Sequence, residues 1–347
     1  MRSILCLILA VFVQLNGATR AVASIGMSEL PASAEFGPLT IFYPASVEPR
    51  VERRGPFKLS VATSAPLIPG NRRLIVISHG SPASPWVHFD RASTLVAAGF
   101  VVAVPEHFAD NYKDDSEPGP PSWRRRPIEV SRAIDRIRAE GRFGSQLDLE
   151  HVGMYGMSAG GHTALTLAGG RWSPSRLRTH CQEHILEDFQ ACAGLFASLS
   201  GGLLDRVKVL VVRSVNDRKL DDPTWYEHTD PRITTIVSGV PFAADFDPES
   251  LRTPKVSLAI VSVRGDQWLS PKFHSDAILQ ACRSCGQLAD LQTGGHGALL
   301  SPLPPDLSGT AAALVADPPG FDREAVVPGL NKLIAAFFVR QLVPPSK

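Results

Sequence analysis

The chain has 347 residues, of which 44% are hydrophobic and 20% are charged. This composition excludes a disordered or fibrous protein and favours one large α/β domain with a buried core. The formal net charge is +1 and no long run of one sign is present, so neither a nucleic-acid partner nor a strongly acidic ligand is indicated.

The beginning of the chain has the pattern of a secretory signal peptide. Arg2 gives a positive start, residues 4–13 are apolar, and Ala21-Val22-Ala23 offers a cleavage site of small residues. The apolar run is shorter than the ~18 residues that a membrane span needs. We therefore expect a signal peptide over residues 1–23 and a single domain over residues 24–347, in a periplasmic or secreted bacterial protein with no stable membrane insertion. An uncleaved anchor is the alternative.

Short apolar runs alternate with helical stretches along the rest of the chain. Strands are expected at residues 36–43, 57–62, 74–77, 100–104, 233–237, 256–263 and 288–292, with a further strand leading into residue 156. Helices are expected at residues 92–98, 124–138, 163–168 and 330–338. The first two strands flank a loop around Pro49 and are expected at the edge of the sheet. The alternation predicts an α/β fold whose mostly parallel sheet carries helices on both faces.

Two regions do not fit this alternation. Residues 208–213 have the composition of a strand but fall where a small cap or lid insertion is expected. Residues 108–123 form a long loop that contains Asp114-Asp115-Ser116 and Pro118-Gly119-Pro120-Pro121. We expect both regions to shape access of a substrate to the site.

Four cysteines follow the signal peptide, an even number in a chain bound for an oxidising compartment. They are Cys181, Cys192, Cys282 and Cys285. Of the three possible connectivities, the local one is favoured, which pairs the first with the second and the third with the fourth. The last two also have the Cys-x-x-Cys spacing of a redox pair, but no thioredoxin-like strand precedes them. His180 and His184 lack a convincing fourth ligand, so no metal site is predicted.

The most informative segment is Gly156-Met157-Ser158-Ala159-Gly160, which follows an apolar strand and precedes a helix-forming run. This order is that of a nucleophile elbow, in which small residues permit a sharp turn that exposes the serine hydroxyl. Because five residues alone also fit an ordinary glycine-rich turn, the prediction depends on a matching base and acid elsewhere.

A base and an acid follow Ser158 in the expected chain order. His296, in Gly295-His296-Gly297 after the last expected strand, is the candidate base. Asp266 follows the strand at 256–263 and is the favoured acid. The alternatives for the acid are Asp245, Asp247 and Asp217.

The segment Ser78-His79-Gly80-Ser81 follows the strand at 74–77, where the first oxyanion donor is normally found. The backbone N–H groups of Ser81 and Ala159 are the expected donors. Substrate-binding positions are expected at His79, Gly80, His107 and Met157. His162 lies one helical turn after Ser158 and is expected to pack behind the elbow.

On these motifs the chain resembles the α/β-hydrolase superfamily, and within it the bacterial predicted dienelactone hydrolases that are related to platelet-activating-factor acetylhydrolases. The resemblance runs from about Phe36 to the final helix. Two further segments contribute to the resemblance, Pro105-Glu106-His107 and Arg126-Pro127-Ile128-Glu129-Val130-Ser131. It implies a serine triad and ester hydrolysis without a cofactor. True dienelactone hydrolases use a cysteine nucleophile where this chain has Ser158, so the family label does not define the reaction.

The expected function is therefore cleavage of short-chain or lactone-like carboxylic esters through an acyl-enzyme on Ser158, with a small-molecule ester as the only partner indicated. One alternative is a binding protein that kept this fold without turnover. Another is an acyltransferase or perhydrolase activity at the same triad, in which an acceptor other than water takes the acyl group. The sequence does not indicate an oligomeric state.

Overall fold

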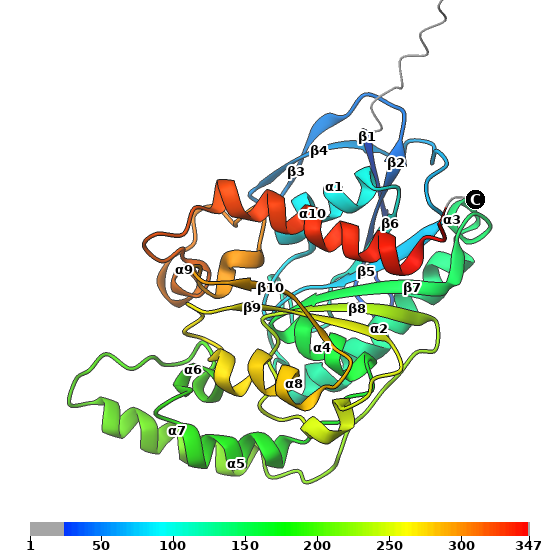
Figure 1. The fold of residues 1–347 in the computed structure, drawn as a ribbon. Coiled ribbons are helices and arrows are strands. Elements are labelled where there is room, and N and C mark those ends of the chain that lie inside the picture. The colour runs from blue at the N-terminus through cyan, green and yellow to red at the C-terminus, as the bar shows by residue number, and fades with distance from the viewer. Residues whose placement is uncertain (1–23, 346–347) are drawn as a thin grey trace, which may run out of the picture.

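The computed structural model describes residues 24–345 of the chain (Figure 1). The expected signal peptide lies outside the described residues, and the first strand begins at Ser24.

The described chain forms one mixed sheet of ten strands. In the order of pairing, the strands are β10 (Gly286–Leu291), β9 (Ser257–Val263), β8 (Ile233–Gly239), β7 (Asp148–Met157), β5 (Arg73–Ser78), β6 (Val101–Pro105), β2 (Leu39–Ala45), β1 (Ser24–Leu30), β4 (Phe57–Thr63) and β3 (Arg50–Arg54). Strands β6, β5, β7, β8, β9 and β10 run parallel. β2 pairs antiparallel with β6 on one side and with β1 on the other. The mostly parallel sheet is as predicted.

Helices cover both faces of this sheet. The α-helices are α1 (Phe89–Ala97), α2 (Pro120–Ala139), α3 (Gly141–Gly144), α4 (Ala159–Leu167), α5 (Pro174–His184), α6 (Phe189–Ala193), α7 (Asp205–Lys219), α8 (Ser275–Ala281), α9 (Gly309–Val315) and α10 (Arg323–Leu342). Short 3-10 turns are η1 (Pro85–His88), η2 (Pro248–Leu251), η3 (Pro271–Phe273) and η4 (His296–Leu299). In Figure 1, α1 and α10 lie on one face, while α2, α4 and α8 lie on the other.

The alternation of side chains along the strands explains the two layers. In β5, Leu74 and Val76 belong to the apolar cluster beneath α2 and α4, whereas Ile75 and Ile77 belong to the cluster beneath α1 and α10. A strand buried on both faces reads as a continuous apolar run, which is why this strand was recognisable in the sequence.

α10 is long and apolar enough to cross a membrane by length and composition, and it is the only such helix among residues 24–345. It packs beside α1 over β7 and β8, and Ile334 and Phe338 on its inner face are fully buried. A core helix passes the same test of composition.

Two expectations at the N-terminal side were wrong. The strand expected at 36–43 is β2, which lies inside the sheet between β6 and β1, and the strand expected at 57–62 is β4, which is covered by β3. The edge is β3, whose side chains are mostly charged and exposed, as suits a strand with one unpaired side.

The segment between α4 and β8 forms a cap of three helices, α5, α6 and α7, which Figure 1 shows grouped at the lower border of the molecule. Residues 208–213, for which a strand was considered, lie in the middle of α7. The expectation of a strand was therefore wrong, and the expectation of an inserted cap holds for this part of the chain.

Two disulfides are present, and both have the local pairing that the sequence favoured. Cys181–Cys192 joins α5 to α6 within the cap, and Cys282–Cys285 closes the turn between α8 and β10.

Replacing both Cys181 and Cys192 with serine is expected to lower the free energy of unfolding by about 3 kcal/mol, mainly because the bond restricts the unfolded chain. The matched control is Cys282→Ser with Cys285→Ser. The bond that it removes closes a shorter loop, with a sequence separation of 3 rather than 11, so the free energy of unfolding should fall by about 2 kcal/mol. Guanidinium unfolding measures both values. A larger loss from the second pair would contradict the loop-entropy argument.

Candidate active site

The turn between β7 and α4 places Ser158 in a conformation that serine rarely adopts. Its φ is +57° and its ψ is −119°, a strained backbone that costs about 1–3 kcal/mol. The Ser158 N–H donates to the Gly239 carbonyl at 3.1 Å, and the N–H groups of Phe242 and His162 donate to the Ser158 carbonyl. These bonds to neighbouring segments hold the strained turn in place.

The glycines of the turn are required by close approach of backbone segments. A Cβ atom on Gly156 would lie 1.9 Å from the Gly160 carbonyl oxygen, and one on Gly160 would lie 2.0 Å from the Ser78 carbonyl oxygen. No side chain fits at these distances, so α4 begins directly against the ends of β5 and β7.

His296 lies beside this serine. Its Nε2 is 2.9 Å from Ser158 Oγ and its Nδ1 is 2.7 Å from Asp266 Oδ2. In a neutral imidazole protonated at Nδ1, the ring donates to the aspartate and accepts from the serine hydroxyl. Arg323 at the start of α10 donates to the carbonyls of Gly297 and Leu300, which fixes the turn that carries the histidine.

Asp266 is held by its own loop after β9. Its Oδ1 accepts the N–H groups of Trp268 at 2.8 Å and Leu269 at 3.0 Å, and Oδ2 remains for His296. Because both oxygens are engaged, the carboxylate has one orientation toward the imidazole.

The three alternative acids lie elsewhere. Asp245 is 3.0 Å from His162 Nε2, Asp247 pairs with Arg171 at 2.6 Å, and Asp217 accepts from Gln182 at 2.8 Å. None of them contacts His296.

The segment Gly80-Ser81 runs alongside the serine, since a Cβ on Gly80 would lie 3.6 Å from the Cβ of Ser158. Ala159 is the first residue of α4, where an amide has no carbonyl one turn earlier in the helix to bond. The two expected oxyanion donors therefore lie on segments next to Ser158. Their role stays a prediction.

A buried ion pair supports this segment from behind. Arg126 of α2 and Asp110 are both fully buried and pair at 2.8 Å. The guanidinium also donates to the carbonyls of His79 and Gly80, and Asp110 accepts the hydroxyl of Ser81. Burial raises the pKa of Asp110, but the charge of Arg126 and the hydrogen bonds from Ser122, Ser81 and Arg126 together outweigh burial, and the pKa lies below its ordinary range.

The two histidines that are expected to bind substrate, His79 and His107, also belong to this support. His107 Nε2 is 2.7 Å from Ser78 Oγ, and its Nδ1 contacts the Glu129 carboxyl. His79 contacts the Gly80 carbonyl through Nδ1 and accepts the N–H of His107 at Nε2. Both rings are fully buried, and their expected role in substrate binding stays a prediction. Met157 is also buried, and the expectations for Met157 and Gly80 stay predictions.

Burial sets the charge states in this network. It lowers the pKa of both His79 and His107 well below the ordinary value, and nearby Arg126 adds to the effect. Burial raises the pKa of Glu129 to about 7, although Phe108 N–H and Arg126 act in the opposite direction. Both imidazoles are therefore neutral at neutral pH. They support the segment through hydrogen bonds, and because they are neutral they need no counter-charge.

Sequence reasoning found no role for Arg126, Glu129 or Asp110. A signal was present in α2, because Arg126 and Glu129 share its buried face with Trp123, Val130 and Ala133. A charged residue on the apolar face of a helix is rarely buried without a partner.

His162 packs behind the elbow as expected. Its ring is stacked on Trp123 at 4.8 Å and lies 4.9 Å from Trp172 between ring centroids. This aromatic group joins α2 and α4 to the base of the cap.

The cap is joined to the loop of the candidate acid through Asp188. This buried carboxylate accepts the N–H of Ser270 and contacts His180 and His274, each within 3.2 Å. Burial raises the pKa of Asp188, but the hydrogen bonds from His180 and His274 outweigh this effect. The net pKa lies below its ordinary value, so the carboxylate stays ionised.

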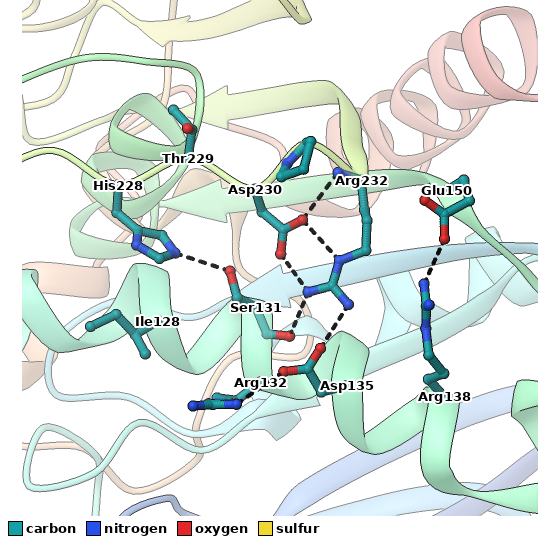
Figure 2. Close-up of a pocket in the computed structure, with 11 residues that line it drawn as sticks. Ile128, Ser131, Arg132, Asp135, Arg138, Glu150, His228, Thr229, Asp230 and Arg232 are labelled. Atoms are coloured by element: carbon teal, nitrogen blue, oxygen red, sulfur yellow. Dashed lines mark hydrogen bonds and ion pairs between the residues drawn. The ribbon is translucent and has the colours of Figure 1, made fainter.

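A surface pocket of about 530 Å³ lies away from Ser158, between α2, the start of β7 and the segment before β8 (Figure 2). Its charges are largely paired with one another: Arg232 pairs with Asp230 and Asp135, and Arg138 pairs with Glu150. Because these charged side chains already pair with one another, few are free to bind an ionic ligand. No residue of the candidate triad lines this pocket.

Within residues 24–345, no group of three or more His, Cys, Asp or Glu side chains is arranged to hold a metal ion. Cys181, between the two histidines that were considered as ligands, is bonded to Cys192.

The sheet order, the helices on both faces, the elbow and the inserted cap together define the α/β-hydrolase fold. The chain is similar in fold to a ferulic acid esterase from Streptomyces cinnamoneus, with a TM-score of 0.58 over 95% of this chain and 93% of the other, at 17% sequence identity. At this identity the likeness establishes the fold alone. The chain matches no protein-family model and no curated protein, so the relation to dienelactone hydrolases and platelet-activating-factor acetylhydrolases stays a prediction.

The raised pKa of Glu129 predicts a measurable dependence of stability on pH. Below about pH 4.5 this group is protonated in both the folded and the unfolded chain; as pH rises toward 7, only the unfolded chain releases its proton. The stability of the folded chain therefore falls across this window. Glu129→Gln removes the titration, and between pH 4 and 8 it should gain about 3 kcal/mol relative to the wild type.

Urea unfolding at several pH values measures this difference. Glu117→Gln, which removes an exposed carboxyl just before α2, controls for the loss of one negative charge. Parallel pH profiles for Glu129→Gln and the wild type would show that burial does not hold the proton.

Proposed function

We propose that this protein is a secreted or periplasmic serine hydrolase that cleaves carboxylic esters through an acyl-enzyme on Ser158. The observation that carries the proposal is the continuous contact from Asp266 through His296 to Ser158, with distances of 2.7 and 2.9 Å. A serine hydroxyl is a weak nucleophile at neutral pH and needs such a base in contact with it.

In the proposed reaction, Ser158 Oγ attacks the ester carbonyl while His296 Nε2 takes the hydroxyl proton. Asp266 stabilises the imidazolium and keeps the ring in the required orientation. The histidine then returns the proton to the leaving alcohol, and water attacks the acyl-enzyme with His296 acting again as the base.

The backbone N–H groups of Ser81 and Ala159 are proposed to stabilise the oxyanion, where one donor is typically worth about 3 kcal/mol of barrier. Arg126 and Asp110 are proposed as positioning residues, because they hold the carbonyls of His79 and Gly80 and the hydroxyl of Ser81. A fixed loop keeps the donor aimed at the charge that develops in the transition state.

Two further observations support the proposal. The similar structure is described as a ferulic acid esterase, which is consistent with ester chemistry on this fold. The two disulfides are typical of an oxidising compartment outside the cytoplasm.

Ser158→Ala is expected to lower kcat on a short-chain p-nitrophenyl ester by at least about 10⁴-fold, because no nucleophile remains beside His296. Labelling of the wild type by a fluorophosphonate should be lost in the same variant. Ser131→Ala is the matched control, since Ser131 Oγ lies 3.1 Å from His228 but sits on α2 without an elbow (Figure 2). A wild type that neither turns over esters nor reacts with the probe would contradict the proposal.

Asp266→Asn should reduce kcat by about 10⁴-fold with the fold intact, because the amide favours the wrong tautomer of His296. Asp247→Asn, an aspartate of the preceding loop that pairs with Arg171, should retain near-normal turnover. Kinetics with the same ester and near-UV circular dichroism test both variants. If the two variants lose activity equally, the assignment of the acid is wrong.

A further inference from the structure

The cap helix α7 exposes an apolar stripe. Its members repeat at three- and four-residue spacing along the helix and the turn before it, and between 43% and 97% of each side chain is exposed. They are Leu203, Leu204, Val207, Leu210, Val211 and Val215. Phe196, in the loop between α6 and α7, is 91% exposed. A contiguous apolar surface of this kind marks an interaction site more often than isolated exposed residues do.

α7 packs against the cap through the face opposite the stripe. The opposite side of α7 is buried, with Val212 and Asn216 facing the cap. Asn216 Nδ2 donates to the Cys192 carbonyl at 3.1 Å, and Arg213 donates to the Gln182 carbonyl at 3.0 Å. The helix is therefore fixed to the disulfide-bonded pair α5 and α6, and the stripe faces outward.

The charges beside the stripe are mostly positive. Among residues 203–220, five are basic and two are acidic. Both acids are engaged: Asp205 pairs with Lys208 at 2.8 Å, and Asp217 accepts from Gln182. Arg206 and Arg218 are exposed and form no ion pair among the described residues.

The shape of the stripe, together with the basic residues beside it, favours one kind of occupant. α7 has 15 residues and is about 22 Å long, and one face of a helix is about 10 Å wide. The part of the stripe on α7 is therefore a narrow strip with a footprint of roughly 200 Å², which follows one face of a single helix. An amphipathic helix that lies in the head-group region of a bilayer needs no more than such a face.

We propose that α7 docks the protein on a lipid surface with anionic head groups, with the apolar stripe inserted and the basic residues of α7 near the phosphates. Such a helix combines a buried apolar area with electrostatic attraction to the head groups. This inference does not depend on turnover at Ser158.

Flotation with vesicles of phosphatidylcholine and phosphatidylglycerol tests the proposal. Val207→Glu with Leu210→Glu places two charges in the stripe and should lower the fraction bound by at least about tenfold. The matched control is Leu186→Glu with Val51→Glu, which changes two equally exposed aliphatic residues outside the stripe and should bind like the wild type. Arg206→Gln with Arg218→Gln should weaken binding only when phosphatidylglycerol is present.

All variants keep the same N-terminus, so any contribution of residues 1–23 is equal among them, and near-UV circular dichroism confirms their folding. Absence of wild-type binding, or equal binding by the stripe variant, would overturn the proposal. A wild type that ignores vesicles but sediments as a dimer, with a monomeric stripe variant, would assign the surface to a second copy of the chain.

Discussion

The contact between the start of α4 and the end of β5 is the constraint on which the site depends. Gly160 lies so close to the Ser78 carbonyl that no side chain fits between them. This approach brings Ser158 next to the Gly80-Ser81 segment, and the same register sets the serine beside the loops that follow β9 and β10. A larger residue at Gly160 would separate Ser158 from both neighbours at once.

Charged groups beneath this contact act as a framework. A buried ion pair contributes little net stability when it replaces apolar packing, but loss of one partner leaves an uncompensated charge. The pair of Arg126 and Asp110 is therefore understandable as a device for geometry, because its hydrogen bonds end on backbone carbonyls and a hydroxyl of the segment beside Ser158. The neutral His107 extends this framework to Ser78 at the end of β5.

Much of this arrangement could be predicted from the sequence, because parallel strands bring their C-terminal ends to one edge. Ser158, Asp266 and His296 each follow such an end, so spacing along the chain was sufficient to predict their contact. Arg126 could not be assigned in this way, because its acceptors come from two loops whose paths no local pattern specifies. Residues 208–213 were misjudged because their valines favour a strand locally, whereas the longer pattern from Leu203 to Val215 is helical.

The attachment of the cap links the redox environment in which the chain folds to the candidate site. Asp188 lies within the loop closed by Cys181–Cys192 and holds Ser270, four residues beyond Asp266. Reduction of the bond would loosen this loop and, with it, the contact that holds the segment after Asp266, whose carboxylate contacts His296. The thiol state of two residues in the cap thereby bears on the geometry at Ser158, and a chain folded under reducing conditions would lack one of the restraints that the oxidised chain has.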